Sequence, residues 1–506
     1  MQTEHLAEEA AASALVIFGA SGDLTRRKLF PALYNLALSK ALPSGFAAIG
    51  VARRPKSDAS FAGEMKEGVE RYSRSGPIDE AAWSRLAEGV AYVAGTFESP
   101  ETYAALQARL SAFDASHGTS GSRVYYLAVA PQDVLGMVRA LSDAGLLPRA
   151  TREPGRPFAR VVVEKPFGED KASAQALSQQ LYRYIDESQL YRIDHYLGKE
   201  TIQNLIVLRF GNAIFEPLWN RNHVSHVEIT VAEDIGIEGR GKFYERVGIT
   251  RDIVQNHLLQ LLTIVAMEPP VALDADAIRD EKVKVLRSIR PLSGEAVSAN
   301  VVRGQYKKGQ LGGEKVPGYR EEPDVARDST TDTFVAMRLF LDSWRWAGVP
   351  FFVRAGKRLS RRVAEVAVHF RAPPLSLFRG PSFAQRAPNA LVIRVQPDES
   401  IELRFDTKVP GAGMAMEEAA MAFRYQTTFG GSSPEAYERL ILDALRGDAT
   451  LFTRADEVEA QWGFIDPILQ AWRRKSAPLS FYESGTMGPV EADQLVATAG
   501  FTWRRP

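Results

Sequence analysis

Short apolar runs alternate with amphipathic helical patterns over the first third of the chain. Residues 14–18 (ALVIF) form an apolar run typical of a buried strand, and residues 28–38 follow with apolar side chains at helical spacing. Further strand-like runs occupy residues 46–51, 124–129 and 159–164. Because strands and helices alternate, the pattern predicts a parallel, doubly wound α/β sheet of the Rossmann-like type.

The remainder of the chain is rich in strand-like runs that few helices separate. These runs lie at residues 224–231, 333–341, 351–354, 363–370, 391–395 and 401–405. They predict a larger α+β domain with a wide, mostly antiparallel sheet and helices on one face. We expect a first domain over residues 14–194 and a second over 195–506. Residues 1–13 are acidic and polar, and they predict a disordered leader, not a signal peptide.

Composition and charge exclude several classes of protein. The 506 residues contain no cysteine, which excludes disulfides, thiol nucleophiles and Cys-based metal sites. Lys plus Arg and Asp plus Glu both number 62, so the net charge is zero and argues against nucleic-acid or membrane partners. The longest apolar runs are shorter than the about 20 residues that span a bilayer. We therefore expect a cytoplasmic protein.

A glycine-containing turn follows the first predicted strand and leads into a helix. Its candidate ligand-binding residues are Gly19, Ser21, Gly22, Asp23 and Leu24. Glycine lets backbone amides approach a pyrophosphate at a helix N-terminus. The spacing Gly-x-x-Gly matches only half of the dinucleotide fingerprint, so an ordinary strand-to-helix turn is the alternative.

The end of the second predicted strand indicates which dinucleotide the turn would bind. An NAD site places an acidic residue there to bind the ribose, but this chain has Arg53 and Arg54. Arginine binds a 2′-phosphate through two parallel hydrogen bonds, and Lys28 adds a second positive charge. The sequence therefore favours NADP, with solvated surface cations as the alternative.

A lysine precedes proline at the end of the strand over residues 159–164. Lys165 and Pro166 follow Glu164, and proline restricts the preceding residue to extended conformations. Ligands of α/β proteins bind at the carboxyl ends of the strands. We therefore expect Lys165 beside a nicotinamide, although an exposed lysine at the start of a loop is the alternative.

Two of the seven histidines stand among chemically useful neighbours. His195 lies in a run of carboxylate, imidazole, phenol and ammonium groups near Lys199, and His, Tyr and Lys are donors that suit a phosphate dianion. A solvated loop with incidental charges is the alternative. His257 lies at the edge of an apolar helical stripe, where a satisfied core histidine is the simplest interpretation. A half-buried imidazole there would also suit a general base. On an ideal helix Asp252 projects away from His257, so Asp194 is the better candidate for an orienting carboxylate if the two segments meet in the fold.

The spacing His223-x-x-His226 suggests a metal site only weakly. Residues three apart on a strand point to opposite faces, and the sequence around them contains no further histidine or acidic cluster. We therefore expect no metal.

Several motifs together resemble the glucose-6-phosphate dehydrogenase family. They are GASGDLTRRKLFPAL, EKPFG, RIDHYLGKE, FGNAIFEPLWNRNHV, RDIVQNHLLQLL, DSTTDTFVAMRLFLDSWRWAGVPFFVRAGKRL and DEVEAQWGFIDPI, in order from about residue 14 to about residue 490. The resemblance implies oxidation of glucose 6-phosphate at C1 to 6-phospho-D-glucono-1,5-lactone by NADP⁺, the first step of the oxidative pentose phosphate pathway.

The resemblance also implies a role for each matching residue. His257 is implied as the general base, Asp194 as its orienting carboxylate and Lys165 as the lysine between coenzyme and substrate. Implied substrate contacts are His195, Tyr196, Lys199, Glu233, Asp252, Lys357 and Arg362. Implied coenzyme contacts are Ser21, Gly22, Asp23, Lys28 and Arg53.

Departures from the family pattern limit what the resemblance implies. Val363 and Ala367 replace basic residues of the structural NADP site known in some members, so no second NADP is expected. Some relatives accept both coenzymes, so tolerance of NAD beside NADP is the alternative that the resemblance leaves open. The family is commonly dimeric through its large sheet, which predicts a homodimer or a dimer of dimers. The alternative function is that of another NAD(P)-dependent sugar oxidoreductase of the glucose–fructose oxidoreductase-like group, which also has a Glu-Lys-Pro strand end.

Overall fold

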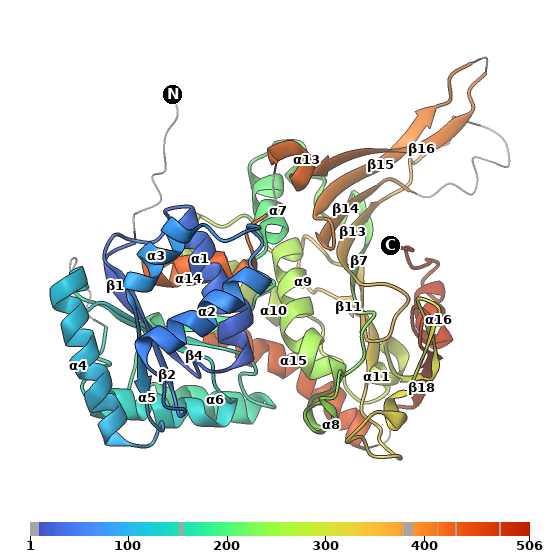
Figure 1. Cartoon of the computed structure of the whole chain (residues 1–506). Helices are drawn as coiled ribbons and strands as arrows, with labels where there is room; N and C mark the ends of the chain where they lie inside the picture. Colours follow the sequence, from blue (N-terminus) through green and yellow to red (C-terminus); the bar gives the residue numbers. More distant parts are fainter. Residues whose placement is uncertain are drawn as a thin grey trace. The chain divides into compact units, whose positions relative to one another are not determined.

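The chain folds into two compact units (Figure 1). The structure is a computed structural model that describes residues 10–150, 156–375, 377–378, 388–411, 413–430, 433–474 and 477–506. Unit 1 comprises Met1–Gly198, Ala272–Arg279 and Pro434–Glu459, and unit 2 comprises Lys199–Val271, Asp280–Ser433 and Ala460–Pro506. The units divide four residues beyond the boundary expected from the sequence, and two later segments join unit 1. Residues 1–9 of the predicted leader lie outside the described residues.

Unit 1 is built on a seven-stranded sheet in the order β17-β6-β5-β4-β1-β2-β3. All neighbouring strands are parallel except β17 and β6. The strands are β1 (Ser13–Phe18), β2 (Phe46–Ala52), β3 (Val90–Ala94), β4 (Arg123–Leu127), β5 (Ala159–Val163), β6 (Leu190–Ile193) and β17 (Phe452–Thr453). The parallel doubly wound sheet is confirmed, whereas β3, β6 and β17 were not predicted.

Helices lie on both sides of the unit 1 sheet. They are η1 (Thr25–Leu29), α1 (Phe30–Leu38), α2 (Asp58–Tyr72), α3 (Glu80–Glu88), α4 (Pro100–His117), η2 (Pro131–Asp133), α5 (Val134–Asp143), α6 (Lys171–Leu181), η3 (Glu187–Gln189) and α14 (Ala436–Arg446). Two further helices, α10 (Ala275–Ser288) and α15 (Ala455–Arg473), run from unit 1 into unit 2.

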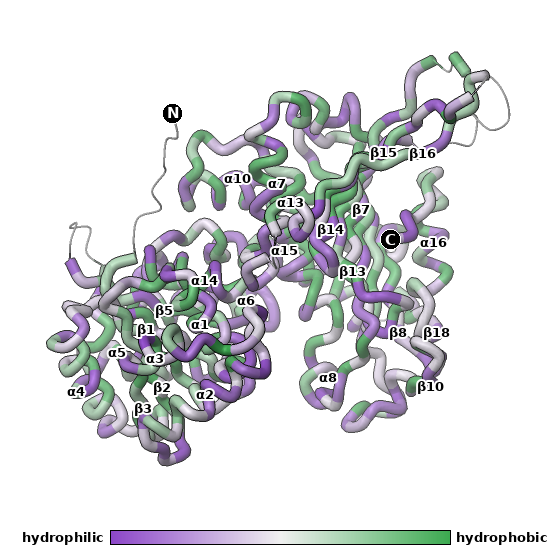
Figure 2. Tube along the Cα trace, turned by 45° about the horizontal axis from the view of Figure 1, so that its top comes forward, coloured by the Kyte–Doolittle hydropathy of each residue, from purple (hydrophilic) through white to green (hydrophobic). Residues whose placement is uncertain are grey.

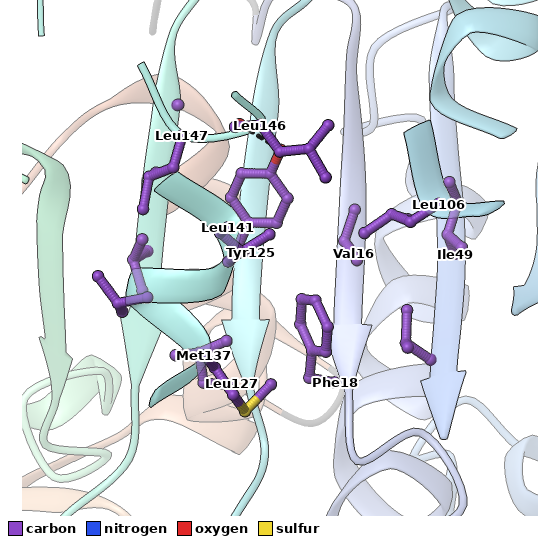
Figure 3. Packing of buried hydrophobic residues seen from close by; sticks show 14 of the residues in the cluster. Val16, Phe18, Ile49, Leu106, Tyr125, Leu127, Met137, Leu141, Leu146 and Leu147 are labelled. Atoms are coloured by element: carbon purple, nitrogen blue, oxygen red, sulfur yellow. Dashed lines mark hydrogen bonds between the residues drawn. The ribbon is translucent and has the colours of Figure 1, made fainter. Parts of the chain in front are cut away.

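Alternating residues of the parallel strands form the core of unit 1 (Figure 3). Val16 and Phe18 of β1 share one face of the sheet with Tyr125 and Leu127 of β4, and Leu141 of α5 packs against that face. Burying such a side chain contributes roughly 1.5–3 kcal/mol. Hydrophobic residues accordingly concentrate along the strands (Figure 2). The core holds the sheet so that the carboxyl ends of β1, β2, β4, β5 and β6 share one edge.

Unit 2 is built on a nine-stranded sheet in the order β16-β15-β14-β13-β7-β12-β11-β8-β18. The pairs β7/β12 and β8/β18 are parallel and the other neighbours are antiparallel, as predicted for this domain. The strands are β7 (Val224–Ala232), β8 (Val301–Lys307), β11 (Phe334–Phe340), β12 (Pro350–Gly356), β13 (Val363–Phe370), β14 (Ala390–Gln396), β15 (Ser400–Lys408), β16 (Met416–Arg424) and β18 (Leu479–Glu483). A separate hairpin joins β9 (Gly309–Leu311) and β10 (Glu314–Val316).

The helical segments of unit 2 are mostly short. They are α7 (Glu200–Phe210), η4 (Glu216–Leu218), α8 (Gly241–Ile249), η5 (Thr250–Leu258), α9 (Leu259–Ala266), α11 (Glu295–Asn300), η6 (Tyr319–Glu321), α13 (Tyr425–Phe429) and α16 (Val490–Ala497). Among the described residues, we find no helix with the length and apolar character needed to cross a membrane.

Both faces of the unit 2 sheet are covered, so the prediction of helices on one face is wrong. Phe351 packs against Trp346, whose indole donates to the Ala266 carbonyl at the end of α9. The next residue, Phe352, points to the opposite face and packs against Trp503 of the C-terminal segment. Figure 1 shows α9 and α16 on opposite sides of β7 and β11.

The face under the C-terminal segment is unusually polar. It includes the buried residues His226, Glu228 and Arg354. Glu228 and His369 also lie beside His226, so the expectation that nothing completes a cluster at that histidine is wrong.

Candidate active site

The turn after β1, where the sequence predicts a pyrophosphate site, is closed by its own backbone. The Gly19 amide donates to the Val51 carbonyl at 3.0 Å, and the Gly22 amide donates to the Gly19 carbonyl at 2.9 Å. Gly19 has φ of +80°, and a Cβ atom there would lie 2.1 Å from the Ala128 carbonyl oxygen. Only glycine fits this position, which leads the chain from the carboxyl end of β1 into the first helix.

The end of β2 carries cations where an NAD site would carry an acid. Arg53 and Arg54 are both exposed, and residues 52–56 contain no carboxylate. Lys28, in contrast, lies 2.8 Å from Glu435 in an ion pair whose side chains are 45% and 39% exposed. Because such an exposed pair is worth at most about 1 kcal/mol, Lys28 can exchange Glu435 for a phosphate at little cost. These residues fit a 2′-phosphorylated dinucleotide.

The carboxyl end of β5 places a buried acid next to the predicted lysine. Glu164 accepts hydrogen bonds from the Tyr126 hydroxyl at 2.5 Å and the Tyr437 hydroxyl at 3.3 Å. Burial raises the pKa of the Glu164 carboxyl. Lys165 follows, half-buried, and its peptide bond to Pro166 is cis. Tyr437 could not be found from the sequence, because α14 is far from β5 along the chain.

The carboxyl end of β6 carries the next group of predicted residues. Asp194 is 2% exposed, and its Oδ1 accepts the Tyr196 amide at 3.0 Å. The Leu197 amide donates to the Asp194 carbonyl at 3.0 Å, which closes a tight turn. The His195 and Tyr196 rings meet edge to face at 5.1 Å. Unit 1 thus collects Gly19, Arg53, Lys165, Asp194 and His195 at the carboxyl ends of its parallel strands.

Two predicted substrate residues meet at one edge of the unit 2 sheet. Glu233 directly follows β7 and Lys357 directly follows β12, and Ala232 pairs with Gly356 in this parallel pair. Lys357 Nζ therefore lies 2.5 Å from Glu233 Oε2, and it lies 3.9 Å from Asp252 Oδ2. Lys357 is 1% exposed, so one buried cation holds two carboxylates.

Tyr244 completes this group although the sequence analysis did not find it. Lys357 Nζ lies 5.4 Å from the centroid of its ring. Burial, followed by the charge of Asp252, raises the pKa of the Tyr244 hydroxyl, which therefore stays protonated and available as a donor. In the sequence, only the helical spacing of Tyr244, Gly248 and Asp252 indicates that Tyr244 belongs with Asp252. The same spacing is typical of ordinary helix packing, so it does not identify a functional residue.

The predicted base lies in a π-helix, whereas the sequence analysis assumed an α-helix. Thr250–Leu258 (η5) is π-helical and continues as α9. His257 is 1% exposed, not half-buried at the edge of a stripe. Residues of a π-helix are bonded five apart, so the ideal-helix angle that separated Asp252 from His257 does not apply. π-Helical turns inside α-helices occur frequently at functional sites.

A buried aspartate fixes the start of this π-helix. Asp332 accepts hydrogen bonds from the Thr250 amide at 2.9 Å and from its hydroxyl at 2.6 Å. Gly248, with φ of +63°, permits the approach, since a Cβ there would lie 2.5 Å from Asp332 Oδ1. The motif DSTTDTF therefore holds the segment that carries His257.

The remaining predicted residues lie at the same edge of the unit 2 sheet. Lys199 is the N-cap of α7, and its ammonium donates to the Gln396 side chain at the end of β14. Gln396 pairs in register with Ala364 of β13, and Arg362 lies exposed immediately before that strand. Gln396 was missed because a single amide before proline carries little signal. Asp194 and His257 belong to different units, so their interaction stays a prediction.

Two family models match the chain over nearly its whole length. The model described as "Glucose-6-phosphate dehydrogenase, NAD binding domain" matches residues 16–204, and the model of the C-terminal domain matches residues 206–504. The chain is also 48% identical to a glucose-6-phosphate 1-dehydrogenase of Aggregatibacter actinomycetemcomitans, with 97% of each chain covered. The chain belongs to the glucose-6-phosphate dehydrogenase family.

Other members of the glucose-6-phosphate dehydrogenase family agree in sequence and in structure. A relative from Mycobacterium tuberculosis strain H37Rv is 45% identical over 97% of this chain and 94% of its own length. A solved glucose-6-phosphate dehydrogenase in complex with glucose 6-phosphate has a TM-score of 0.88 at 34% identity, over 98% of this chain and 99% of the other. The predicted family and fold are confirmed, and the chain is an oxidoreductase. The glucose–fructose oxidoreductase-like alternative is not favoured.

Proposed function

We propose that the chain oxidises D-glucose 6-phosphate at C1 to 6-phospho-D-glucono-1,5-lactone, with NADP⁺ as the hydride acceptor, as the first step of the oxidative pentose phosphate pathway. The observation that carries the proposal is the edge of the unit 2 sheet, where Glu233, Asp252 and Lys357 form one charged cluster in a chain with 48% identity to a named glucose-6-phosphate 1-dehydrogenase. Carboxylates accept hydrogen bonds from sugar hydroxyls, and the ammonium suits an anionic or hydroxyl oxygen.

His257 is the proposed general base. Its imidazole accepts the proton of the C1 hydroxyl, and Asp194 holds the ring in the required tautomer. A bound nicotinamide ring supplies the hydride-accepting chemistry. The π-helical turn and its Asp332 anchor keep His257 in place without substrate, so the site is preorganised.

The 6-phosphate is proposed to bind His195, Tyr196 and Lys199. All three are donors, and the turn after β6 presents them within five residues. Lys357 and Arg362 are proposed as further substrate contacts. Glu233 and Asp252 orient the sugar by accepting bonds from its hydroxyl groups.

The coenzyme is proposed to lie along the carboxyl edge of the unit 1 sheet. Gly19, Ser21, Gly22, Asp23 and Leu24 form the turn that cradles its pyrophosphate. Arg53, assisted by Lys28, selects the 2′-phosphate of NADP⁺ over NAD⁺. Lys165 lies between the coenzyme and the sugar.

An absorbance assay at the NADPH band tests this function. Glucose 6-phosphate with NADP⁺ should give a strong signal, NAD⁺ a weaker one, and free glucose almost none because it lacks the phosphate. Equal rates with glucose and glucose 6-phosphate would contradict the phosphate site. Absence of a signal with either coenzyme would contradict the function itself.

The proposed assembly is a cytoplasmic homodimer, or a dimer of such dimers, without a nucleic-acid or membrane partner. The exposed outer strand β16 supports an interface on the large sheet, since Met421 is 60% exposed there. Light scattering at micromolar concentration should give twice the chain mass or more. A monomer would contradict the proposed assembly and leave the proposed reaction untouched.

A further inference from the structure

Three potential metal ligands converge on one face of the unit 2 sheet, away from the residues proposed for catalysis. His226 of β7 pairs directly with His369 of the antiparallel β13, and Glu228 pairs with Ala367. Residues two apart on a strand share a face, so all three side chains project to the same side. Because Ala367, the residue paired with Glu228, has a small side chain, it leaves room for the two imidazoles beside the Glu228 carboxylate.

The distances within this group approach those of a coordinated ion. Glu228 Oε1 lies 3.5 Å from His226 Nε2 and 3.2 Å from His369 Nε2. The ligand atoms of a tetrahedral zinc site with bonds near 2.0–2.1 Å lie about 3.3 Å apart. The two imidazoles are stacked, with centroids 4.2 Å apart and planes at 5°. One possible ligand atom from each of the three side chains lies within 4.8 Å of the other two.

Neighbouring groups form hydrogen bonds with the potential ligands and so fix their orientation, as the partners of ligand side chains do in metal sites. The Ser225 hydroxyl lies 2.7 Å from His226 Nδ1, which leaves Nε2 to face Glu228. The Arg504 amide donates to the Glu228 carboxylate at 3.0 Å and 3.2 Å. His369 Nε2 is buried and makes no hydrogen bond of normal geometry, although the carboxylate is near.

The cations around this group are occupied by other partners. Arg354 donates to the Thr230 hydroxyl and to the Arg504 carbonyl, and its guanidinium lies over the Trp503 ring. The Arg504 guanidinium lies 3.5 Å from Glu365. Arg404 lies 2.9 Å from Glu418 and 3.2 Å from Glu402, and Arg394 lies 3.7 Å from Glu365. Glu228 therefore accepts hydrogen bonds from the Arg504 backbone amide, and its Oε1 faces the two imidazoles.

A cavity beside the group provides room for a further ligand. It measures about 390 Å³ and is lined by both histidines and by Phe501, Trp503 and Arg504. We propose that His226, Glu228 and His369 bind a divalent ion of the zinc class, with a water molecule or small ligand in the cavity at the fourth position. The ion would pin the C-terminal segment, which reaches Glu228 through the Arg504 amide, onto the sheet.

Cobalt titration of the full chain after dialysis against a chelator tests the site. Co²⁺ should bind with one equivalent per chain, give the visible ligand-field bands of a low-symmetry four-coordinate site, and be displaced by Zn²⁺. Two paramagnetically shifted imidazole N–H signals should appear in proton NMR spectra of the cobalt protein. Absence of saturable binding, or of these signals, would leave an ordinary buried histidine–carboxylate cluster and overturn the proposal.

Variants identify the ligands. Ser225→Ala removes a hydrogen-bond partner of a ligand and should lower the affinity for Co²⁺ by roughly 10- to 100-fold. Glu228→Gln and His369→Ala each remove a ligand and should lower the affinity by more than that. The matched control is His223→Ala, because His223 is exposed and outside the group. Dehydrogenase activity of each variant reports that it is folded. Unchanged affinity in His369→Ala, or a loss in His223→Ala equal to it, would contradict the assignment.

Discussion

The two sheet edges that carry the proposed active site are built by different means. The edge of unit 1 uses a backbone turn at Gly19 and exposed cations such as Arg53. The edge of unit 2 uses a buried ammonium, Lys357, between two carboxylates, and a histidine fixed in a π-helix. A coenzyme that must enter and leave suits the first kind of edge. Removal of the C1 hydroxyl proton as hydride leaves C1 suits the second, in which the groups are held before substrate arrives.

Removal of the proposed base should give the largest effect at the rigid edge. His257→Asn keeps an uncharged hydrogen-bonding side chain but cannot take the C1 proton at neutral pH. We expect kcat to fall by roughly 10²- to 10⁴-fold, with dissociation constants for glucose 6-phosphate and NADP⁺ nearly unchanged. Steady-state assays and calorimetry measure the two quantities. The control is His223→Asn on the surface, and near-normal turnover of the His257 variant would contradict the base assignment.

Loss of the buried ammonium should affect both stability and binding. Lys357→Met leaves Glu233 and Asp252 without their shared cation, and breaking a buried pair costs about 3–5 kcal/mol. Because the two carboxylates are 23% and 18% exposed, we expect the lower end of that range, together with a raised KM for glucose 6-phosphate. Urea unfolding and initial rates measure these effects.

A Lys357 variant with wild-type stability would mean that the carboxylates are solvated and that the two edges do not differ in rigidity. The matched control is Lys242→Met, an exposed lysine of α8. Its stability and KM should stay within the error of the wild type.

The positions of the candidate residues at the unit 1 edge could be predicted from the sequence, because each of them comes soon after an apolar strand. Gly19, Arg53 and Lys165 could all be placed in this way. The unit 2 edge was not accessible by the same reasoning. Glu233 and Lys357 are 124 residues apart and meet only because β7 and β12 are parallel neighbours, a pairing that strand patterns do not specify.

Local helix geometry was the second obstacle. The periodicity around His257 fits an α-helix, and the π-helical turn arises from tertiary contacts such as that of Thr250 with Asp332. The same limit applies to the polar face of the sheet. His226 and His369 become neighbours only through the antiparallel register of β7 and β13.

Coenzyme selectivity should depend on the exposed edge. Arg53→Ala removes the arginine's contact with a charged phosphate, and a loss of about 1.5–3 kcal/mol lowers kcat/KM for NADP⁺ roughly 10- to 150-fold. The kcat/KM for NAD⁺ should change little in the variant. In the wild type, raised salt should reduce the ratio of kcat/KM for NADP⁺ to that for NAD⁺. Arg54→Ala is the neighbouring control. Equal losses for NADP⁺ and NAD⁺ would contradict a role at the 2′-phosphate.

The smallest effect should come from Glu164, an acid at the edge of unit 1 that two tyrosine hydroxyls contact. Its pKa is raised by burial, so the folded protein binds a proton there more tightly than the unfolded chain, whose carboxyl titrates near about 4.3. The stabilising contribution of the protonated form is complete below that pH and is lost as pH rises through the folded pKa. Glu164→Gln keeps an acceptor for the Tyr126 and Tyr437 hydroxyls without the charge.

The Gln variant should therefore gain thermal stability over the wild type as pH rises from about 4 to 8, and lose that advantage at the acidic end. Melting temperatures across this range measure the difference, with Glu98→Gln as an exposed control on the same unit. If the difference in melting temperature between the Gln variant and the wild type increased toward low pH, the pH dependence would be opposite to the one expected. It would mean that Lys165 stabilises the Glu164 carboxylate more than burial disfavours it, and that this edge, like that of unit 2, depends on an ion pair.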